Sequence, residues 1–141
     1  MRAALLDAFD GDVRIVEVPT PRPGPGEVLV DVAACGVGLT LERARTGALG
    51  GSTPRVVGHE IGGVIADLGS GVTGWAVGDR VTTSFYLLCG RCTWCAGGHE
   101  TLCANWGGFV GVHVDGGLAE QVVLPAHGLP VHKDARLRVE R

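Results

Sequence analysis

The feature that most constrains this chain is a group of four cysteines, spaced C-x2-C-x2-C-x7-C, within 15 of its 141 residues. They are Cys89, Cys92, Cys95 and Cys103, and the glycines among them free the backbone to turn between ligands. Four thiolates from one loop can close a tetrahedron around zinc, which leaves no position for water or substrate. The spacing therefore predicts a structural zinc lobe at about residues 86–107. Two disulfides, or a reduced loop without metal, are the alternatives.

The charge balance of the chain bears on its partners. Zinc ribbons that bind nucleic acid or protein also use CxxC pairs, but they usually separate the two pairs by a longer hairpin. The chain has 12 basic and 15 acidic residues, a net charge of −3 and a pI of about 5.9, and no dense cluster of Lys and Arg. A nucleic acid and an anionic membrane surface are therefore excluded as expected partners.

Apolar residues make up 45% of the chain, but no apolar run approaches the ~20 residues that a membrane-spanning helix needs. Asp7 interrupts the N-terminal stretch too early for the apolar core of a secretory signal. Clustered thiols without such a signal are typical of a reducing compartment. We therefore expect a cytoplasmic protein without a membrane span.

Short apolar and alternating segments, separated by turns rich in glycine and proline, predict a chain of short strands. The clearest short helix is expected at 39–46, closed by Gly47. This pattern indicates one mainly β domain over residues 1–141, a barrel or sandwich with few short helices. The expected strands are 2–9, 12–18, 27–34, 61–68, 79–85 and 118–124.

Residues 69–74 match the dinucleotide-binding pattern G-x-G-x-x-G. That pattern binds a pyrophosphate only when a helix begins at its end. The segment that follows breaks at Gly78 and continues as an expected strand, so we interpret residues 69–74 as a turn. The sequence therefore predicts no Rossmann domain in this chain, and no binding of NAD or NADP by the chain alone.

A second pattern, G-H-E-x2-G-x5-G-x2-V, begins at Gly58 and contains His59 and Glu60. Together with the four-cysteine loop, the proline-rich segment at 21–30, and the motifs at 78–81 and 115–120, it resembles the zinc-containing alcohol dehydrogenases of the medium-chain dehydrogenase/reductase family. The resemblance covers essentially the whole chain, in the expected order. It implies a GroES-like β-barrel, normally followed by a Rossmann domain that binds NAD or NADP.

The resemblance also implies roles for individual residues. His59 matches the histidine of the catalytic zinc, Glu60 matches the adjacent carboxylate, and Thr40 matches the hydroxyl that relays the substrate proton. Cys89, Cys92, Cys95 and Cys103 match the structural zinc lobe. In the family a catalytic zinc polarises the alcohol oxygen while hydride leaves to the nicotinamide.

The sequence departs from the family where the first catalytic-zinc ligand is expected. Gly38 stands at the usual cysteine position, Leu41 at the usual aspartate, and Arg43 where a histidine often continues the proton relay. Cys35 lies three residues too early and is interpreted as a small buried apolar residue. The sequence therefore predicts one structural zinc, and it leaves a second zinc on His59 and Glu60 as an open alternative.

Three hypotheses about function follow. In the first, the chain is the barrel of an oxidoreductase that transfers hydride between a small alcohol or carbonyl and NAD(P), supplied by a Rossmann-domain partner. In the second, hydride goes to an activated alkene held by Thr40 or His59 without a catalytic zinc. In the third, a stand-alone, non-redox barrel stabilised by zinc binds a small molecule or a protein partner, and homo-oligomerisation covers its exposed face.

Overall fold

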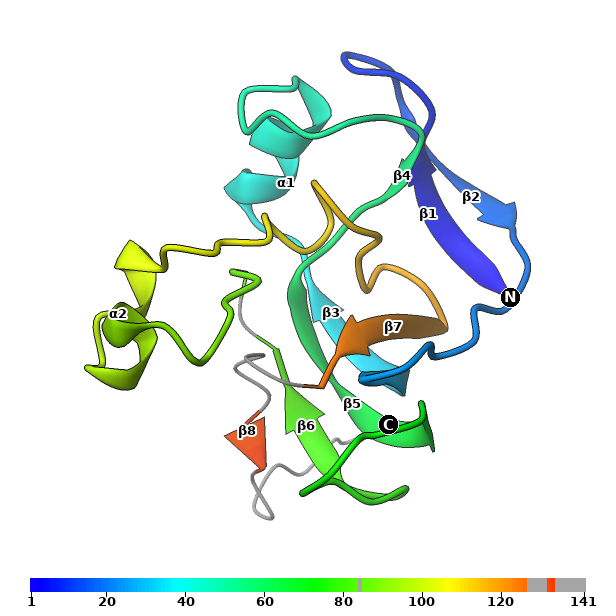
Figure 1. The fold of residues 1–141 in the computed structure, drawn as a ribbon. Coiled ribbons are helices and arrows are strands. Elements are labelled where there is room, and N and C mark those ends of the chain that lie inside the picture. Colours follow the sequence, from blue (N-terminus) through cyan, green and yellow to red (C-terminus); the bar gives the residue numbers. More distant parts are fainter. Residues whose placement is uncertain (84, 127–131, 134–141) are drawn as a thin grey trace.

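The computed structural model describes residues 1–83, 85–126 and 132–133 of the chain (Figure 1). Two antiparallel sheets and a few short helices account for its regular structure, which confirms the predicted mainly β fold class. The strands are β1 Arg2–Leu6, β2 Val13–Glu17, β3 Glu27–Gly36, β4 Arg55–Val56, β5 Glu60–Leu68, β6 Arg80–Thr82, β7 Gln121–Pro125 and β8 His132–Lys133. The helices are α1 Leu39–Arg45, α2 Thr93–Ala96 and a 3-10 turn, η1, at Glu100–Leu102.

The smaller sheet has the strand order β2-β1-β4 and is built on the N-terminal hairpin. β1 and β2 pair in register from Arg2 opposite Glu17 to Leu6 opposite Val13. The first strand ends earlier than expected, at Leu6 rather than at Phe9, because the chain turns through Asp10 with a positive φ of 60°. Aspartate tolerates this left-handed conformation better than most residues.

The larger sheet has the order β7-β3-β5-β6-β8, and β3 and β5 form its longest ladder. Two irregularities in that ladder, after Leu29 and after Val32, bend the strand pair. Gly63 lets the strands approach closely, because a β-carbon there would collide with the carbonyl oxygen of Asp31. Every pair of neighbouring named strands among the described residues is antiparallel, so this part of the chain contains no parallel βαβ unit.

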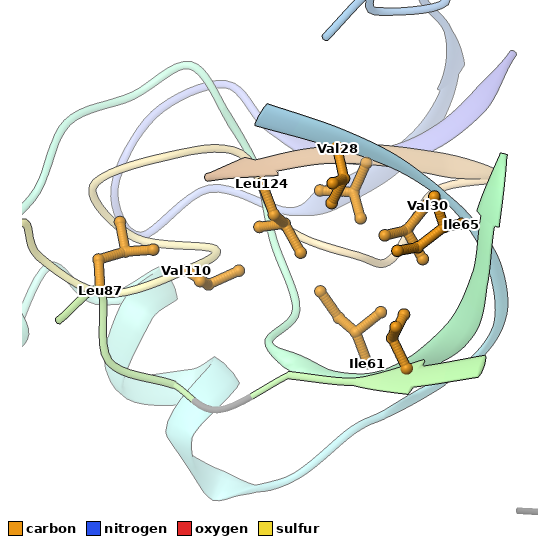
Figure 2. Close-up of a cluster of buried hydrophobic side chains, with 9 residues drawn as sticks. Val28, Val30, Ile61, Ile65, Leu87, Val110 and Leu124 are labelled. Atoms are coloured by element: carbon orange, nitrogen blue, oxygen red, sulfur yellow. The ribbon is translucent and has the colours of Figure 1, made fainter. Parts of the chain in front are cut away.

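The main core consists of buried side chains from the strands of the larger sheet, together with Leu87 and Val110 (Figure 2). Val30, Leu124 and Ile65 are almost fully buried there, and Leu87 and Val110 join them from the two sides of the cysteine lobe. A second, smaller cluster of Ala4, Leu6 and Val57 supports the N-terminal sheet. Alternation of apolar and polar residues along the strands is what places these side chains on one face.

Residues 69–74 form a turn, as predicted, and no helix follows them. Gly71 and Gly74 both have positive φ angles, of 77° and 80°, which glycine adopts without strain. The segment continues through a second turn at Gly78 into β6. The expected strand at 79–85 is observed only as Arg80–Thr82, and Ser84 lies outside the described residues.

Candidate functional site: a four-cysteine lobe beside a histidine–glutamate pair

The four clustered cysteines come together on one lobe of the chain, drawn at the left of Figure 1 around α2. Cys92 precedes α2, Cys95 lies in it, Cys103 follows η1, and Cys89 enters from the preceding loop. Their four sulfur atoms all lie within 4.8 Å of one another, and Sγ of Cys89 is 4.0 Å from Sγ of Cys95. Zn–S distances of about 2.3 Å in a tetrahedron require S···S separations of roughly 3.8 Å, so this set of donors fits zinc.

Backbone and side-chain N–H groups point at these sulfurs. The amide of Cys89 donates to Sγ of Cys103 at 3.4 Å, and Nδ2 of Asn105 lies 3.9 Å from Sγ of Cys89. Hydrogen bonds from the backbone N–H groups of Arg91 and Cys92 lower the pKa of Cys89 to about 6. A thiolate held by N–H donors is the form of cysteine that binds metal.

Two paired segments hold the lobe at its base. The amide of Gly107 donates to the carbonyl of Leu87 at 2.8 Å, the amide of Leu87 donates to the carbonyl of Gly108 at 2.9 Å, and Tyr86 forms a bridge with Phe109. The lobe is thus a long loop whose two ends are paired with each other at its base. The glycine-rich segment within it has almost no buried apolar side chains. Because so little packing orders this loop, a bound metal would be its main source of rigidity.

Glu60 is the first residue of β5 and His59 directly precedes it, in the segment that leads from β4 of the N-terminal sheet into the larger sheet. Nε2 of His59 is 3.9 Å from Oε1 of Glu60, with the imidazole 13% exposed and the carboxylate 56% exposed. The hydroxyl of Thr83 donates to the carbonyl of His59 at 3.2 Å and fixes the backbone there. Burial lowers the pKa of His59, and the negative charge of Glu60 opposes that effect only in part.

The carboxylate of Glu60 lies against two glycines of the opposite segment. A β-carbon at Gly36 would collide with it, and a β-carbon at Gly38 would lie 3.4 Å from Oε1. Position 38 therefore faces the His59–Glu60 pair, but glycine supplies no donor there. Elsewhere in the described part of the chain, no other group of three or more His, Cys, Asp and Glu ligand atoms gathers closely enough to hold a metal.

Cys35 does not replace the missing donor. Its sulfur packs against the main core and against Gly58, and it lies 3.8 Å from the carbonyl oxygen of Gly36, to which its thiol donates. Burial raises the pKa of this thiol to about 11, so it stays protonated at neutral pH. These contacts fit the interpretation of Cys35 as a small apolar core residue.

Thr40, Leu41 and Arg43 all lie on α1, the helix that begins directly after Gly38. Thr40 is half-buried in the first turn, which follows Gly38, the residue whose β-carbon position would lie 3.4 Å from Oε1 of Glu60. Leu41 packs against the smaller core cluster, and Arg43 is exposed. The structure therefore places Thr40 two residues after Gly38 in the first turn of α1, and it gives Leu41 a packing position in the smaller core cluster.

An aromatic group beside His59 was missing from the sequence analysis. The ring of Phe85 lies 4.4 Å from the imidazole, and Phe109 stacks on Phe85 at 4.1 Å with the two planes 3° apart. Trp106 and Tyr86 then meet Phe109 edge-on, at 4.9 Å and 5.3 Å. We call these four residues the aromatic wall. Their sequence positions could have indicated this contact, because they flank the cysteine lobe on both sides and the pairing at its base brings the two flanks together.

Comparisons with known proteins agree with this architecture. Residues 24–134 match the model of the alcohol dehydrogenase GroES-like domain. The chain is 39% identical over 133 residues to L-threonine 3-dehydrogenase of Xanthomonas campestris pv. campestris, and 42% identical over 136 residues to that of Stenotrophomonas maltophilia. Each alignment covers 92% of this chain and 39% of the relative, so the chain spans about two fifths of the length of these curated relatives.

Solved structures show the same relationship. The crystal structure of AibC superimposes with a TM-score of 0.90 at 38% identity, covering 98% of this chain and 39% of that chain. A cobalt- and zinc-bound thermostable alcohol dehydrogenase from Pyrobaculum aerophilum gives a TM-score of 0.82 at 41% identity, covering 89% of this chain and 39% of that chain. No helix in the described ranges is long and apolar enough to cross a membrane.

Proposed function

Because this chain belongs to the zinc-containing alcohol dehydrogenases of the medium-chain dehydrogenase/reductase family, we propose that it is the substrate-side domain of an oxidoreductase. The partner in hydride transfer is NAD or NADP, carried by a Rossmann domain that joins it. The substrate is a small alcohol or carbonyl compound, or an activated alkene. One observation carries the proposal: His59 and Glu60 meet at the start of β5, next to the first turn of α1 and the aromatic wall.

The zinc site in this proposal is the four-cysteine lobe. Cys89, Cys92, Cys95 and Cys103 would hold the zinc, and four sulfur donors leave no position for substrate. A zinc ion held there would supply rigidity to the loop beyond the base, where Leu87 pairs with Gly107 and Gly108 next to the aromatic wall. Its contribution to activity is therefore indirect, through the position of Phe85 beside His59.

A second zinc does not fit the donors present at the other site. His59 and Glu60 offer two ligand atoms, whereas a catalytic zinc takes three from protein. Gly38 has no side chain to complete the set. We therefore assign the chemistry at this site to the side chains themselves.

Oxidation of an alcohol removes a hydride from carbon and a proton from oxygen. In the proposed reaction the hydride goes to the nicotinamide, and the proton of the substrate hydroxyl passes to Thr40, which gives up its own proton to the neutral imidazole of His59. The lowered pKa of His59 keeps the imidazole neutral near pH 7, so it can accept that proton. Carbonyl reduction runs the same steps in reverse. With an activated alkene, hydride adds to one carbon and the proton to the other.

The residues around His59 favour a substrate with an apolar carbon skeleton. Phe85 covers one side of His59 and Phe109 stacks on Phe85, while Leu39, 87% exposed, follows Gly38 on the other segment. Apolar surface of this kind binds the carbon skeleton of a substrate, while a few polar groups fix its orientation. The five unpaired thiols of the chain suit the reducing cytoplasm, where we place the protein.

The proposal is tested with a chimera, in which this chain replaces the matching part of L-threonine 3-dehydrogenase from Xanthomonas campestris. We expect the chimera to oxidise alcohols or to reduce carbonyls or enones with a nicotinamide cofactor, and the isolated chain to do neither. His59→Gln should reduce kcat/KM by at least about tenfold, whereas His99→Gln, on the cysteine lobe, should not.

A folded chimera that binds NADH but transfers no hydride to any of these substrate classes contradicts the proposal. That result favours the alternative, a non-redox barrel that zinc stabilises and that binds a small molecule or protein. An equal loss of activity in the two histidine variants contradicts the role of His59.

A further inference from the structure

The main chain of Phe109 has two groups that face away from the base of the cysteine lobe. The segments 85–87 and 108–110 pair there through an antiparallel bridge between Tyr86 and Phe109. The two hydrogen bonds of this pairing, at 2.9 Å and 3.0 Å, are made by the residues on either side of the bridge. In such a pair the N–H and C=O groups of the two bridge residues point outward. Phe109 therefore needs other partners for both groups.

His113 supplies both of these partners. Nδ1 of its imidazole accepts from the amide of Phe109 at 3.1 Å, and its own amide donates to the carbonyl of Phe109 at 2.8 Å. Because Nδ1 accepts this hydrogen bond, the neutral imidazole carries its proton on Nε2. The main chain of Phe109 is thus held from two sides, by the paired segments at the base of the lobe and by His113.

The side chain of His113 is itself closely packed. A β-carbon at Gly108 would lie 2.6 Å from Cβ of His113, and a β-carbon at Gly50 would lie 4.0 Å from its Nε2. The imidazole therefore lies next to both the base of the lobe and the segment after α1. The rings of Trp106 and Phe109 meet it edge-on, at 5.3 Å and 5.5 Å. Packing on several sides holds the imidazole in one orientation, which keeps Nδ1 on the amide of Phe109.

The position of Phe109 affects His59 through one intervening ring. The ring of Phe109 stacks on that of Phe85 at 4.1 Å, and the ring of Phe85 lies 4.4 Å from the imidazole of His59. Rings in contact at these distances have little room to move independently in a packed site. A displacement of the Phe109 main chain would therefore change how Phe85 lies against the imidazole.

We propose that His113 is a positioning residue of the oxidoreductase site: it holds the main chain of Phe109 and so keeps the ring of Phe85 against His59. This inference rests on the proposed function, in which His59 takes up the substrate proton and the aromatic wall binds the carbon skeleton. His113 acts only through Phe109 and Phe85, and it takes no part in the transfer of hydride or proton.

The proposed role requires a hydrogen-bond acceptor at the place of Nδ1, but it does not require a basic nitrogen. Asparagine at position 113 places its Oδ1 at the same number of bonds from the backbone as Nδ1 of histidine. Glutamine places its oxygen one bond further out, near the position of Nε2, and leucine has no acceptor. His113→Asn should therefore preserve the hydrogen bond to the amide of Phe109, whereas His113→Gln and His113→Leu should lose it.

The first part of the test is an NMR comparison of the zinc-loaded chain and its three variants at pH 8, where the lowered pKa of His59 keeps its imidazole neutral. In His113→Gln and His113→Leu, the amide of Phe109 should exchange with solvent at least about tenfold faster. The ring protons of His59 should also lose the ring-current shift that Phe85 imposes on them. His113→Asn should match the original chain in both measurements. If His113→Leu does not fold, His113→Gln, which stays polar, makes the same comparison.

The second part measures kinetics in the chimera described above, with benzyl alcohol and 2-cyclohexen-1-one as probes. We expect His113→Gln to lower kcat/KM by at least about fivefold, and His113→Asn to stay within about twofold of the original chimera. Unchanged NMR signals in His113→Gln contradict the positioning role, as does a normal kcat/KM in a variant that has lost both signals. An original chimera without activity contradicts the proposed function instead, and the NMR comparison then decides whether His113 positions Phe85.

Discussion

Gly38 and Glu60 face each other across the candidate site: a β-carbon at position 38 would lie 3.4 Å from Oε1 of the carboxylate, which itself lies 3.9 Å from Nε2 of His59. The φ of Gly38 is −123°, an extended conformation that any residue adopts. Nothing in the backbone therefore requires glycine at this position. The site lacks a donor at position 38, but it retains the geometry that would place one beside the pair.

This relationship predicts that Gly38→Cys creates a second metal site. A thiolate at position 38 would join His59 and Glu60 as a third donor, the number that catalytic zinc sites take from protein. Elemental analysis should rise by about one zinc per chain, and cobalt substitution should add a thiolate-to-metal absorption band. Gly38→Ala, which adds the β-carbon without the sulfur, is the control. Equal metal content in the two variants would show that the pair is not oriented toward position 38.

The two kinds of cysteine in this chain should respond differently to serine substitution. Cys92→Ser removes one of four donors from a loop that has little other support, so we expect the zinc to be lost and stability to fall by about 3 kcal/mol or more. Cys35→Ser replaces a half-buried sulfur in an intact core, at a cost of about 1 kcal/mol. Denaturant unfolding with parallel zinc analysis separates the two. Equal losses would refute the assignment of Cys92 as a ligand.

Cys35 should also be unreactive in the folded protein. Burial raises its pKa from 9.0 to about 11, so at pH 8 its thiolate fraction is about a hundredfold lower than that of an ordinary cysteine. Iodoacetamide labelling of the zinc-loaded chain, followed by mass spectrometry, should modify Cys35 correspondingly slowly, and the unfolded chain at the normal rate. The same shift means that Cys35 contributes stability that is present below pH 9 and is lost as the pH rises through about 11. Fast labelling of the folded chain would contradict its buried position.

The aromatic wall should depress the pKa of His59. Burial is the larger cause of the shift, and Phe85, which Phe109 holds in place by stacking on it, provides part of that cover. Phe109→Ala should therefore raise the pKa of His59 toward its ordinary value in an NMR titration, whereas Trp94→Ala, which removes a ring near His99, should not. Because the folded state holds His59 neutral, stability should fall as the pH drops below about 6.5, and this loss should be smaller in Phe109→Ala. An unchanged pKa would show that the wall does not shield the imidazole.

The strands could be predicted well where apolar and polar residues alternate over eight or more positions. Residues 27–34 and 61–68 were expected as strands and are observed as β3 and β5, each slightly longer, and α1 ends one residue before the expected boundary. The two-residue strand β4 was missed, because a pair of residues shows no periodicity and its pairing with Leu5 and Leu6 is set by tertiary packing. The expected strand at 118–124 divides: Ala119 bridges to the N-terminal sheet, and only Gln121–Pro125 joins β3.

The candidate site was predictable to the extent that its residues are close in sequence. The cysteine spacing alone indicated that four sulfurs could meet, and the structure brings them together. The contact between Gly38 and Glu60 follows from the β3–β5 ladder, which pairs Gly36 with Glu60. The stacking of Phe109 on Phe85 could not be predicted, because 23 residues of lobe separate them and only the closed base at Leu87 and Gly107 makes them neighbours.

The most direct test of this account is the zinc content of the chain, purified without added metal or chelator and measured by elemental analysis. We predict one zinc per chain, bound through Cys89, Cys92, Cys95 and Cys103 and absent from Cys92→Ser. A value near zero would contradict the structural lobe. A value near two, with the second zinc lost in His59→Gln, would contradict the conclusion that His59 and Glu60 do not hold a metal by themselves.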